Sequence, residues 1–283
     1  MILVTGSTGN VGGPLAALLH AQGQPVRAAV SSPKSVARLP DPALPYAVLD
    51  FNDPQTYPAA FAGVDRLFLL RPPQISDVDR SIKPVIDYAA ANGVRHIVFL
   101  SLIGAEKNKV VPHAKIEALL EAGPVPYTLL RAGFFMQNLS TTHRLDIVEY
   151  DDVFVPAGKG ETAFVDTRDL AAVAALALTE GGHENKAYPL TGSEALDYYQ
   201  VAAILSDVLR RPITYSNPSL LRFARRMKGR GEAWPYIAVM SAIYTTTRFG
   251  MAAAIHPELE TLLGRPPITF REFAQDEAAV WRK

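Results

Sequence analysis

Two patterns of apolar residues alternate along the first half of the chain. Helical spacing of apolar residues marks residues 11–19, 77–92 and 116–122. Short apolar runs with the length of buried strands separate these stretches, at residues 2–4, 25–30, 46–49, 64–70, 94–100 and 125–131. Alternating strands and helices are typical of a doubly wound parallel sheet, so we predict an α/β fold.

The alternation loosens in the second half of the chain. We expect helices at residues 164–179 and 196–209, and strands at residues 149–156, 187–190 and 213–215. We therefore predict an α/β domain over residues 1–150 with sheet strands returning near residues 151–190, and a smaller C-terminal α/β lobe over residues 191–283.

Two further stretches near the C-terminus have helical character. Residues 220–228 carry apolar side chains on one face and Arg or Lys around the rest. We interpret this stretch as a solvated helix face, in preference to a basic surface for an acidic substrate or a membrane. Residues 234–245 are apolar and aromatic, and we favour core packing for them over the lining of a pocket.

The composition excludes several classes of function. Lys and Arg together number 28, and so do Asp and Glu, which disfavours a nucleic-acid-binding surface. The chain has no cysteine, and the six histidines show no ligand spacing, so we expect no metal site. We also expect no signal peptide and no membrane insertion, and we predict a cytoplasmic location.

A glycine motif follows the first predicted strand. Gly6, Gly9 and Gly12 stand in the frame G-x-x-G-x-x-G, directly before a helix. This order of strand, glycine turn and helix is what a Rossmann-type dinucleotide site requires, because the helix N-terminus binds the pyrophosphate. We assign cofactor contacts to the whole loop: Gly6, Ser7, Thr8, Gly9, Asn10, Val11 and Gly12.

The end of the second strand predicts which dinucleotide binds. An acid at this place would bind the 2′-hydroxyl of NAD, but residues 1–40 contain no Asp or Glu. Ser31 and Lys34 stand there instead, with Arg27 and Arg38 nearby. Hydroxyls and cations suit a 2′-phosphate, so we predict that NADP(H) is preferred over NAD(H).

The ends of the third and fourth strands extend the predicted cofactor site. Asp50 is placed to accept from the adenine amino group with Phe51 packing nearby, or equally to cap the following helix. Leu70, Arg71 and Pro72 follow the fourth strand at the edge where ligands of such sheets bind, so we include them.

Several stretches together resemble the NmrA-like branch of the atypical short-chain dehydrogenase/reductases. They are TGSTGNVG at the start, HAKIEALLEAG followed by VPYTLLRAGFFMQNL, VDTRDLAAVAALAL, and the C-terminal YPLTGSEALDYYQVAAILSDVLRRPITY and LLGRPPITFREFAQD. Within that branch the chain is similar to the bacterial quinone oxidoreductase and triphenylmethane reductase type. The resemblance implies an NAD(P)H-dependent reductase of electron-poor acceptors.

One departure from the wider superfamily concerns the catalytic acid. The superfamily uses Tyr-x-x-x-Lys, and Lys115 matches the lysine, but Val111 stands at the tyrosine position. The resemblance implies that Lys115 holds ribose hydroxyls and that Ser101 occupies the place of the catalytic serine. We consider His113 and Ser101 as proton donors, and His113 is favoured because imidazole titrates near neutrality.

The turn after the sixth strand is expected to border the nicotinamide and the acceptor. Gly133, Phe134 and Phe135 are assigned to the cofactor, and Phe135, Met136 and Asn138 to the substrate. Core packing is the alternative for these aromatic residues.

We therefore predict a reductase with an NAD(P)-binding domain over residues 1–150 and a substrate-binding lobe over residues 191–283. It would transfer hydride from NADPH to a quinone or a similar aromatic small molecule. The competing hypothesis is a non-catalytic NAD(P) redox sensor that acts through a protein partner, and a weaker one is a sugar-nucleotide epimerase or reductase. A homodimer is left open.

Overall fold

The computed structural model describes residues 1–283 and divides the chain into two compact units. Unit 1 consists of Met1–Ala132 and Thr167–Leu190, and unit 2 consists of Gly133–Asp166 and Thr191–Lys283. Each unit therefore draws on two stretches that are separated in the sequence.

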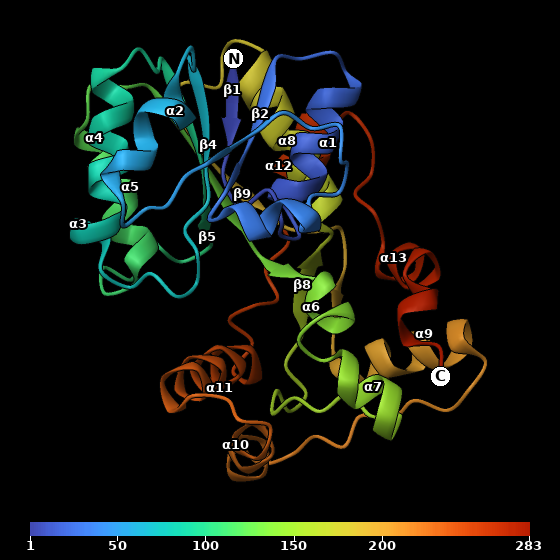
Figure 1. Cartoon of the computed structure of the whole chain (residues 1–283). Coiled ribbons are helices and arrows are strands. Elements are labelled where there is room, and N and C mark those ends of the chain that lie inside the picture. The colour runs from blue at the N-terminus through green and yellow to red at the C-terminus, as the bar shows by residue number, and fades with distance from the viewer. The chain divides into compact units, whose positions relative to one another are not determined.

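Unit 1 is built on a parallel sheet of seven strands in the order β3-β2-β1-β4-β5-β6-β9 (Figure 1). The predicted doubly wound sheet is confirmed. Its strands are β1 (Ile2–Val4), β2 (Val26–Val30), β3 (Tyr46–Val48), β4 (Arg66–Leu69), β5 (His96–Leu102), β6 (Tyr127–Ala132) and β9 (Lys186–Leu190).

Helices cover both faces of this sheet, as a parallel sheet requires. In Figure 1, α2, α4 and α5 lie on one side of the strands, and α1 and α8 lie on the other, where they pack together. The helices of unit 1 are α1 (Gly12–Ala21), η1 (Pro33–Arg38), η2 (Pro54–Thr56), α2 (Tyr57–Phe61), α3 (Val78–Ser81), α4 (Lys83–Ala91), α5 (Pro112–Ala122) and α8 (Thr167–Thr179).

The strand order places the candidate site. β1 is flanked by β2 on one side and by β4 on the other, so the order of the strands reverses at β1. Ligands of such sheets bind at the carboxyl ends of the strands at this reversal. The glycine motif follows β1 directly and therefore lies at that edge.

Two prolines shift helix boundaries from the predicted ones. The single helix expected at residues 77–92 is two helices, because Pro84 stands in the first turn of α4 and has no N–H to continue α3. The helix expected from residue 116 begins at Pro112, a favourable residue for a first turn. His113 and Lys115 therefore lie in the first turn of α5.

Unit 2 contains a small sheet in the order β10-β8-β7 and several helices. The three strands are β7 (Phe134–Phe135), β8 (Thr162–Val165) and β10 (Ala195–Leu196). The helices are α6 (Gln137–Ser140), α7 (Arg144–Tyr150), α9 (Tyr198–Leu209), α10 (Leu220–Gly229), α11 (Trp234–Arg248), α12 (Glu258–Leu263), α13 (Phe270–Asp276) and η3 (Ala278–Trp281).

The strands expected at residues 149–156 and 213–215 are wrong. α7 runs to Tyr150, and Asp151 then turns the chain with a positive φ of 51°. Residues 153–155 are buried in the core of unit 2, so their apolar character comes from burial and not from a sheet. An isolated bridge between Asp152 and Thr214 is all that pairs these two stretches.

Candidate functional site

The glycine loop after β1 has the geometry of a phosphate-binding turn. Gly6 has a φ of +66°, which favours glycine. A Cβ atom on Gly12 would lie 2.5 Å from the Gly6 carbonyl oxygen, so a side chain there would displace the loop. No side chain caps the first turn of α1, where Gly13 donates its N–H to the Gly9 carbonyl and Pro14 has none. The Gly12 N–H is therefore the one that this turn offers to a ligand. The loop therefore fits a dinucleotide pyrophosphate.

The side chains of this loop serve different purposes. The buried Ser7 hydroxyl donates to the Val4 carbonyl at 2.6 Å, so Ser7 can offer only its backbone to a ligand. Val11 is also buried, whereas Asn10 is exposed and Thr8 half-buried. The side chains available to a cofactor are therefore those of Thr8 and Asn10.

A cluster of hydroxyls follows β2, where the 2′-phosphate selectivity is predicted. The Ser35 hydroxyl lies 3.3 Å from that of Ser31 and 3.1 Å from that of Ser32. Arg38 donates to the same Ser35 oxygen at 3.3 Å, and Lys34 is exposed. The cluster thus adds Ser35 and Arg38 to the predicted pair of Ser31 and Lys34.

Arg27 does not belong to this cluster. Its guanidinium donates to the carbonyls of Ala60 at 2.9 Å and Ala62 at 2.8 Å, at the end of α2. It therefore holds α2 against the sheet.

The end of β3 is organised by local turns. Asp50 accepts from the Asn52 backbone N–H at 2.9 Å, and the neighbouring Asp53 caps η2. Asp50 is thus not the helix cap, which was one of our two interpretations. Phe51 is 8% exposed and belongs to the core of unit 1, so only a small part of its side chain is accessible to an adenine.

A polar hollow of about 410 Å³ lies beside this turn. Asn52 and Ser81 meet at its wall, where the Ser81 hydroxyl donates to the Asn52 amide oxygen at 2.7 Å. Because it lies at the carboxyl edge of the sheet, it is a candidate for the adenosine end of the cofactor. It is lined by Asn52, Gln74, Ile75, Ser76, Asp77, Arg80 and Ser81.

The stretch after β4 closes against the glycine loop. The Leu70 side chain lies about 3.1 Å from where a Cβ atom on Gly6 would stand. Arg71 donates to the carbonyls of Pro72 at 2.9 Å and Ile75 at 2.6 Å, so its guanidinium holds the following loop together. Its Nε atom is buried and has no partner. Leu70 therefore adjoins the predicted phosphate site, whereas Arg71 mainly fixes the loop.

Lys115, the predicted ribose ligand, forms an ion pair with Asp79 of α3. Both side chains are at least half exposed, so the pair is weak and open to competition by a ligand. The Lys115 ammonium has three donors, and one is directed to Asp79.

We expected His113 to titrate near neutrality, and it does not. Burial, with the positive charge of Arg71, lowers the pKa of His113 to about 4. Its ring stacks on Phe99 of β5, with the ring centroids 5.9 Å apart. His113 is therefore neutral at pH 7, which removes the reason for favouring it as the proton donor.

Ser101 belongs to a buried ion-pair network. Its hydroxyl donates to the Glu117 carboxylate at 2.5 Å, and Ser101 and Glu117 are each 3% exposed. Arg131 donates to both oxygens of Glu117, from Nε at 3.1 Å and from Nη2 at 2.7 Å. This contact raises the pKa of Arg131. The hydroxyl proton of Ser101 is thus directed to Glu117, inside the protein.

The residues predicted after β6 belong to unit 2. Met136 is fully buried in the core of that unit, which corrects its predicted contact with a substrate. Phe134, Phe135 and Asn138 are half-buried, and Phe134 packs against the same core. Phe135 and Asn138 therefore remain the candidates for a ligand contact in this stretch.

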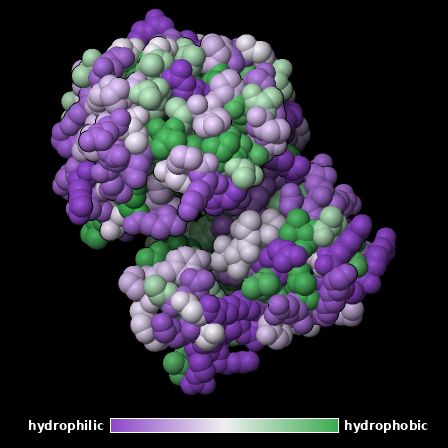
Figure 2. Space-filling model, viewed as in Figure 1, coloured by the Kyte–Doolittle hydropathy of each residue, from purple (hydrophilic) through white to green (hydrophobic).

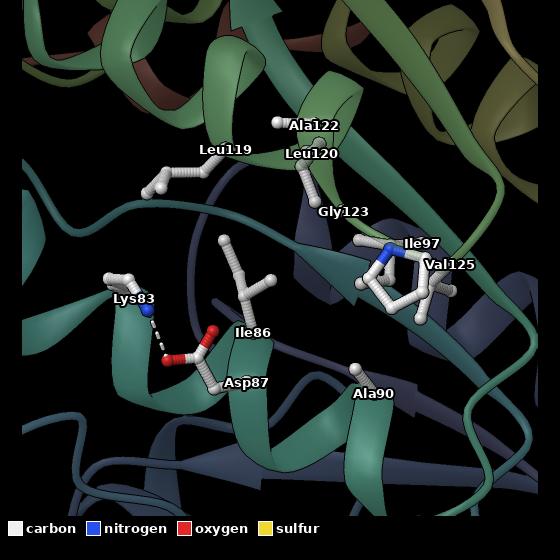
Figure 3. Close-up of a pocket in the computed structure, with 11 residues that line it drawn as sticks. Lys83, Ile86, Asp87, Ala90, Ile97, Leu119, Leu120, Ala122, Gly123 and Val125 are labelled. Carbon is white, nitrogen blue, oxygen red and sulfur yellow. Dashed lines mark hydrogen bonds and ion pairs between the residues drawn. The ribbon is translucent and has the colours of Figure 1, made fainter.

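A second cavity in unit 1 lies at the opposite edge of the sheet. It has a volume of about 220 Å³, and Ile97, near the amino end of β5, lies in its wall. Figure 3 shows the apolar side chains of α4 and α5 around it, with the ion pair between Lys83 and Asp87 at one side. A cofactor at the carboxyl edge would not reach this cavity.

Our sequence reasoning missed Glu117, Arg131, Ser35, Asn52 and Asp79. Glu117 carried a usable signal: it is an acid on the apolar, sheet-facing side of α5, one turn after His113. A charge at a buried helix position usually has a partner, and that partner could have been sought on the neighbouring strands.

Comparison with known proteins gives matches over the whole chain. The NmrA-like family matches residues 1–255. The NAD(P)H azoreductase of Xenophilus azovorans is 34% identical over 286 residues, with 99% of each chain covered. The Escherichia coli quinone oxidoreductase QOR2 complexed with NADPH is 27% identical with a TM-score of 0.86, covering 98% of this chain and 99% of that one. The Citrobacter sp. triphenylmethane reductase is 26% identical with a TM-score of 0.86 and the same coverage.

Proposed function

The chain belongs to the NmrA-like family, and on that premise we propose that it is an NAD(P)H-dependent reductase of quinones or similar conjugated, electron-poor acceptors. The relatives named above are reductases of azo compounds, quinones and triphenylmethane dyes. These acceptors share an extended π-system that accepts a hydride readily.

Residues of unit 1 would hold the cofactor. The glycine loop and the first turn of α1 would bind the pyrophosphate, and Lys115 the nicotinamide ribose. Asp50 and Asn52 are proposed for the adenine, beside the polar hollow. When bound, NADPH supplies the hydride.

The observation that carries this proposal is the state of three side chains at α5 and β5. Val111 has no proton to give, His113 is neutral at pH 7, and Ser101 donates to Glu117. A ketone or aldehyde needs a proton at the oxygen as it accepts a hydride. A quinone or a cationic dye does not, since its reduced form takes a proton from water. For such an acceptor, the protein needs only to bind the cofactor and the acceptor and to orient them for hydride transfer.

The acceptor contacts are proposed for unit 2. Phe135 offers an aromatic ring, and Asn138 an amide, beside the small sheet. A homodimer and a cytoplasmic location stay predictions from the sequence.

The experiment that tests the function follows NADPH oxidation with a simple quinone, an azo dye, a triphenylmethane dye and an aldehyde. We expect turnover with the first three and none with the aldehyde. Lys115→Ala should raise KM for NADPH roughly tenfold, because the ribose loses a charged donor. Lys186→Ala should not, because Lys186 is exposed at the amino end of β9, at the edge of the sheet opposite the site.

Two results would contradict the proposal. Tight binding of NADPH without oxidation by any acceptor would favour the redox-sensor hypothesis. Turnover of the aldehyde at the rate of the quinone would show that a proton donor does operate.

The preference for NADPH has its own test. Ser31→Asp would place a carboxylate in the hydroxyl cluster around Ser35, where we propose that the 2′-phosphate binds. Repulsion should raise Kd for NADPH at least tenfold while leaving Kd for NADH nearly unchanged. An equal loss for both cofactors would place the 2′-phosphate elsewhere.

A further inference from the structure

Residues 216–255 of unit 2, which we call the cationic arm, differ in charge from the rest of the chain. The arm contains α10 and α11 and carries six Lys or Arg residues and one Glu. Its net charge is therefore +5, and the remainder of this neutral chain carries −5. Such a segregation of charge indicates a surface that attracts anions.

Two of the six cations are used inside unit 2. Arg226 donates to the buried Asp146 carboxylate at 2.8 Å, and Arg230 donates to both of its oxygens. These bonds attach α10 to α7. On the outer face of α10, Arg222, Arg225 and Lys228 are exposed.

The outer face of α11 is apolar. Its inner face buries Ile237, Tyr244 and Thr247, but no charged residue lies between Trp234 and Arg248 on either face. A helix that is apolar on both faces normally has a partner on each. The exposed side chains on and after α11 include Trp234 at 60%, Val239 at 58%, Phe249 at 76% and Met251 at 72%.

The cations of α10 adjoin the apolar side chains at the start of α11. α10 packs against α11, and the Lys228 ammonium lies 5.8 Å from the centre of the Trp234 ring. Figure 2 shows hydrophobic and hydrophilic residues side by side at the bottom of the view, where Figure 1 places α10. Exposed tryptophan beside lysine and arginine is typical of a surface that lies in a membrane interface.

In place of the solvated helix face that we expected from the sequence of residues 220–228, we propose that the cationic arm binds the surface of a membrane that contains anionic lipids. Arg222, Arg225 and Lys228 would contact the lipid headgroups, while Trp234, Phe249 and Met251 would enter the boundary between headgroups and acyl chains. A second copy of the chain would bring another +5 surface against the first, so charge disfavours self-association there. An acidic protein would satisfy the cations but would leave the scattered apolar side chains exposed.

The arm lies on the membrane in this proposal and does not cross it. No helix of the chain is long and apolar enough to span a bilayer. Contacts of this kind are reversible, because a few interfacial residues contribute far less than a spanning helix.

The test is cosedimentation of the full chain with phosphatidylcholine vesicles, with and without phosphatidylglycerol. We expect at least tenfold more protein on the anionic vesicles, and a strong decrease at high salt. Arg222→Glu with Arg225→Glu should lower that binding at least tenfold, and Trp234→Ser with Phe249→Ser at least threefold. All four positions are exposed, so thermal melting should confirm that the variants fold.

Matched controls distinguish an effect of the cationic arm from an effect of net charge alone. Lys107→Glu with Lys109→Glu makes the same change in net charge at exposed residues of unit 1, and Tyr46→Ser removes an exposed aromatic ring there. Both should bind vesicles as the wild type does.

Three outcomes would overturn the proposal. They are equal binding to both kinds of vesicle, an equal loss in the Lys107 and Lys109 control, and binding to free polyglutamate without binding to vesicles. The last result would assign the arm to an acidic protein partner.

Discussion

Glu117 in unit 1 and Asp146 in unit 2 are both buried carboxylates paired with arginine, but they organise their surroundings differently. Glu117 accepts from Arg131 on the adjacent β6 and from the Ser101 hydroxyl as well. Asp146 accepts only from Arg226 and Arg230, which lie about 80 residues later in the chain. One acid ties a helix to its own sheet, and the other fastens a distant helix to the core.

This difference shows how to interpret polar residues near a candidate site. A carboxylate is buried only where hydrogen-bonding or charged partners compensate its lost hydration. Those partners are then not available to bind a ligand. The Ser101 hydroxyl is bound to Glu117 in this way, although the position of Ser101 in the sequence suggests a catalytic role. On α10, Arg222 and Arg225 make no contact with Asp146 and are exposed, and our membrane proposal uses them. In both units, the side chains that bond to the buried carboxylate are not available for contacts with a ligand.

The largest effect is expected from Asp146→Ala. Two buried arginine contacts would lose their carboxylate, and breaking such a pair costs about 3 to 5 kcal/mol. Thermal melting should show a strongly lowered Tm, and limited proteolysis should cut within residues 216–255. As a control, Asp207→Ala breaks an exposed pair with Arg271 and should change Tm little. An unchanged Tm for Asp146→Ala would contradict our account of how α10 is attached.

A smaller loss is expected from Glu117→Gln. The amide keeps an acceptor for Ser101 but removes the charge that Arg131 faces, so we expect a loss of about 2 kcal/mol. Urea unfolding followed by circular dichroism would measure it. Glu121→Gln removes the same charge from an exposed position of α5 and should be nearly neutral. If both variants lose the same free energy of unfolding, the network of Ser101, Glu117 and Arg131 does not stabilise α5.

Two histidines, His113 and His143, predict a loss of stability in acid. The pKa of His113 and that of His143 are each lowered to about 4, both mainly by burial. The unfolded chain binds these protons near its ordinary pKa of about 6.5, whereas the folded chain binds them only near 4. Their contribution is complete above about pH 6.5 and is lost as the pH falls towards 4. Tm measured over this range should fall, and His143→Gln should flatten the slope. A Tm that is constant over this range would contradict both shifts.

The smallest effect is expected from Ser101→Ala on catalysis. If the hydroxyl serves Glu117 and not the acceptor, kcat with a quinone should fall less than about threefold, against the hundredfold or more expected for a lost acid. Steady-state kinetics with NADPH and a quinone would measure it. A hundredfold fall in kcat with an unchanged Tm would show that Ser101 takes part in the reaction.

The sheet of unit 1 could be predicted well because its central strands β1, β4, β5 and β6 are short, mostly apolar and mostly buried. The ends of α4 and α5 were misplaced, since Pro84 and Pro112 act through the position of a missing N–H and not through hydrophobic spacing. The strand expected at residues 149–156 failed for another reason. A buried apolar run reveals burial but not whether a neighbouring strand is present to pair with it.

The candidate site could be predicted in its backbone more than in its side chains. The glycines were found because Gly6 and Gly12 are required by backbone geometry that shows in the sequence. The pKa of His113 and the partner of Ser101 depend on groups that only the folded chain brings together. Met136 could not be placed either, because a methionine suits a core and a ligand pocket equally.

The position of β9 at the edge of the sheet affects how the nascent chain folds during synthesis. β9 pairs with β6, but residues 133–166 separate β6 from the segment that supplies it. A ribosome that releases about 5 to 20 residues per second needs several seconds to deliver β9 after β6. During that interval the hydrogen-bonding groups of β6 form an open edge that another nascent chain can pair with. The order in which the sheet is completed thus makes these seconds an aggregation-prone period in the synthesis of the protein.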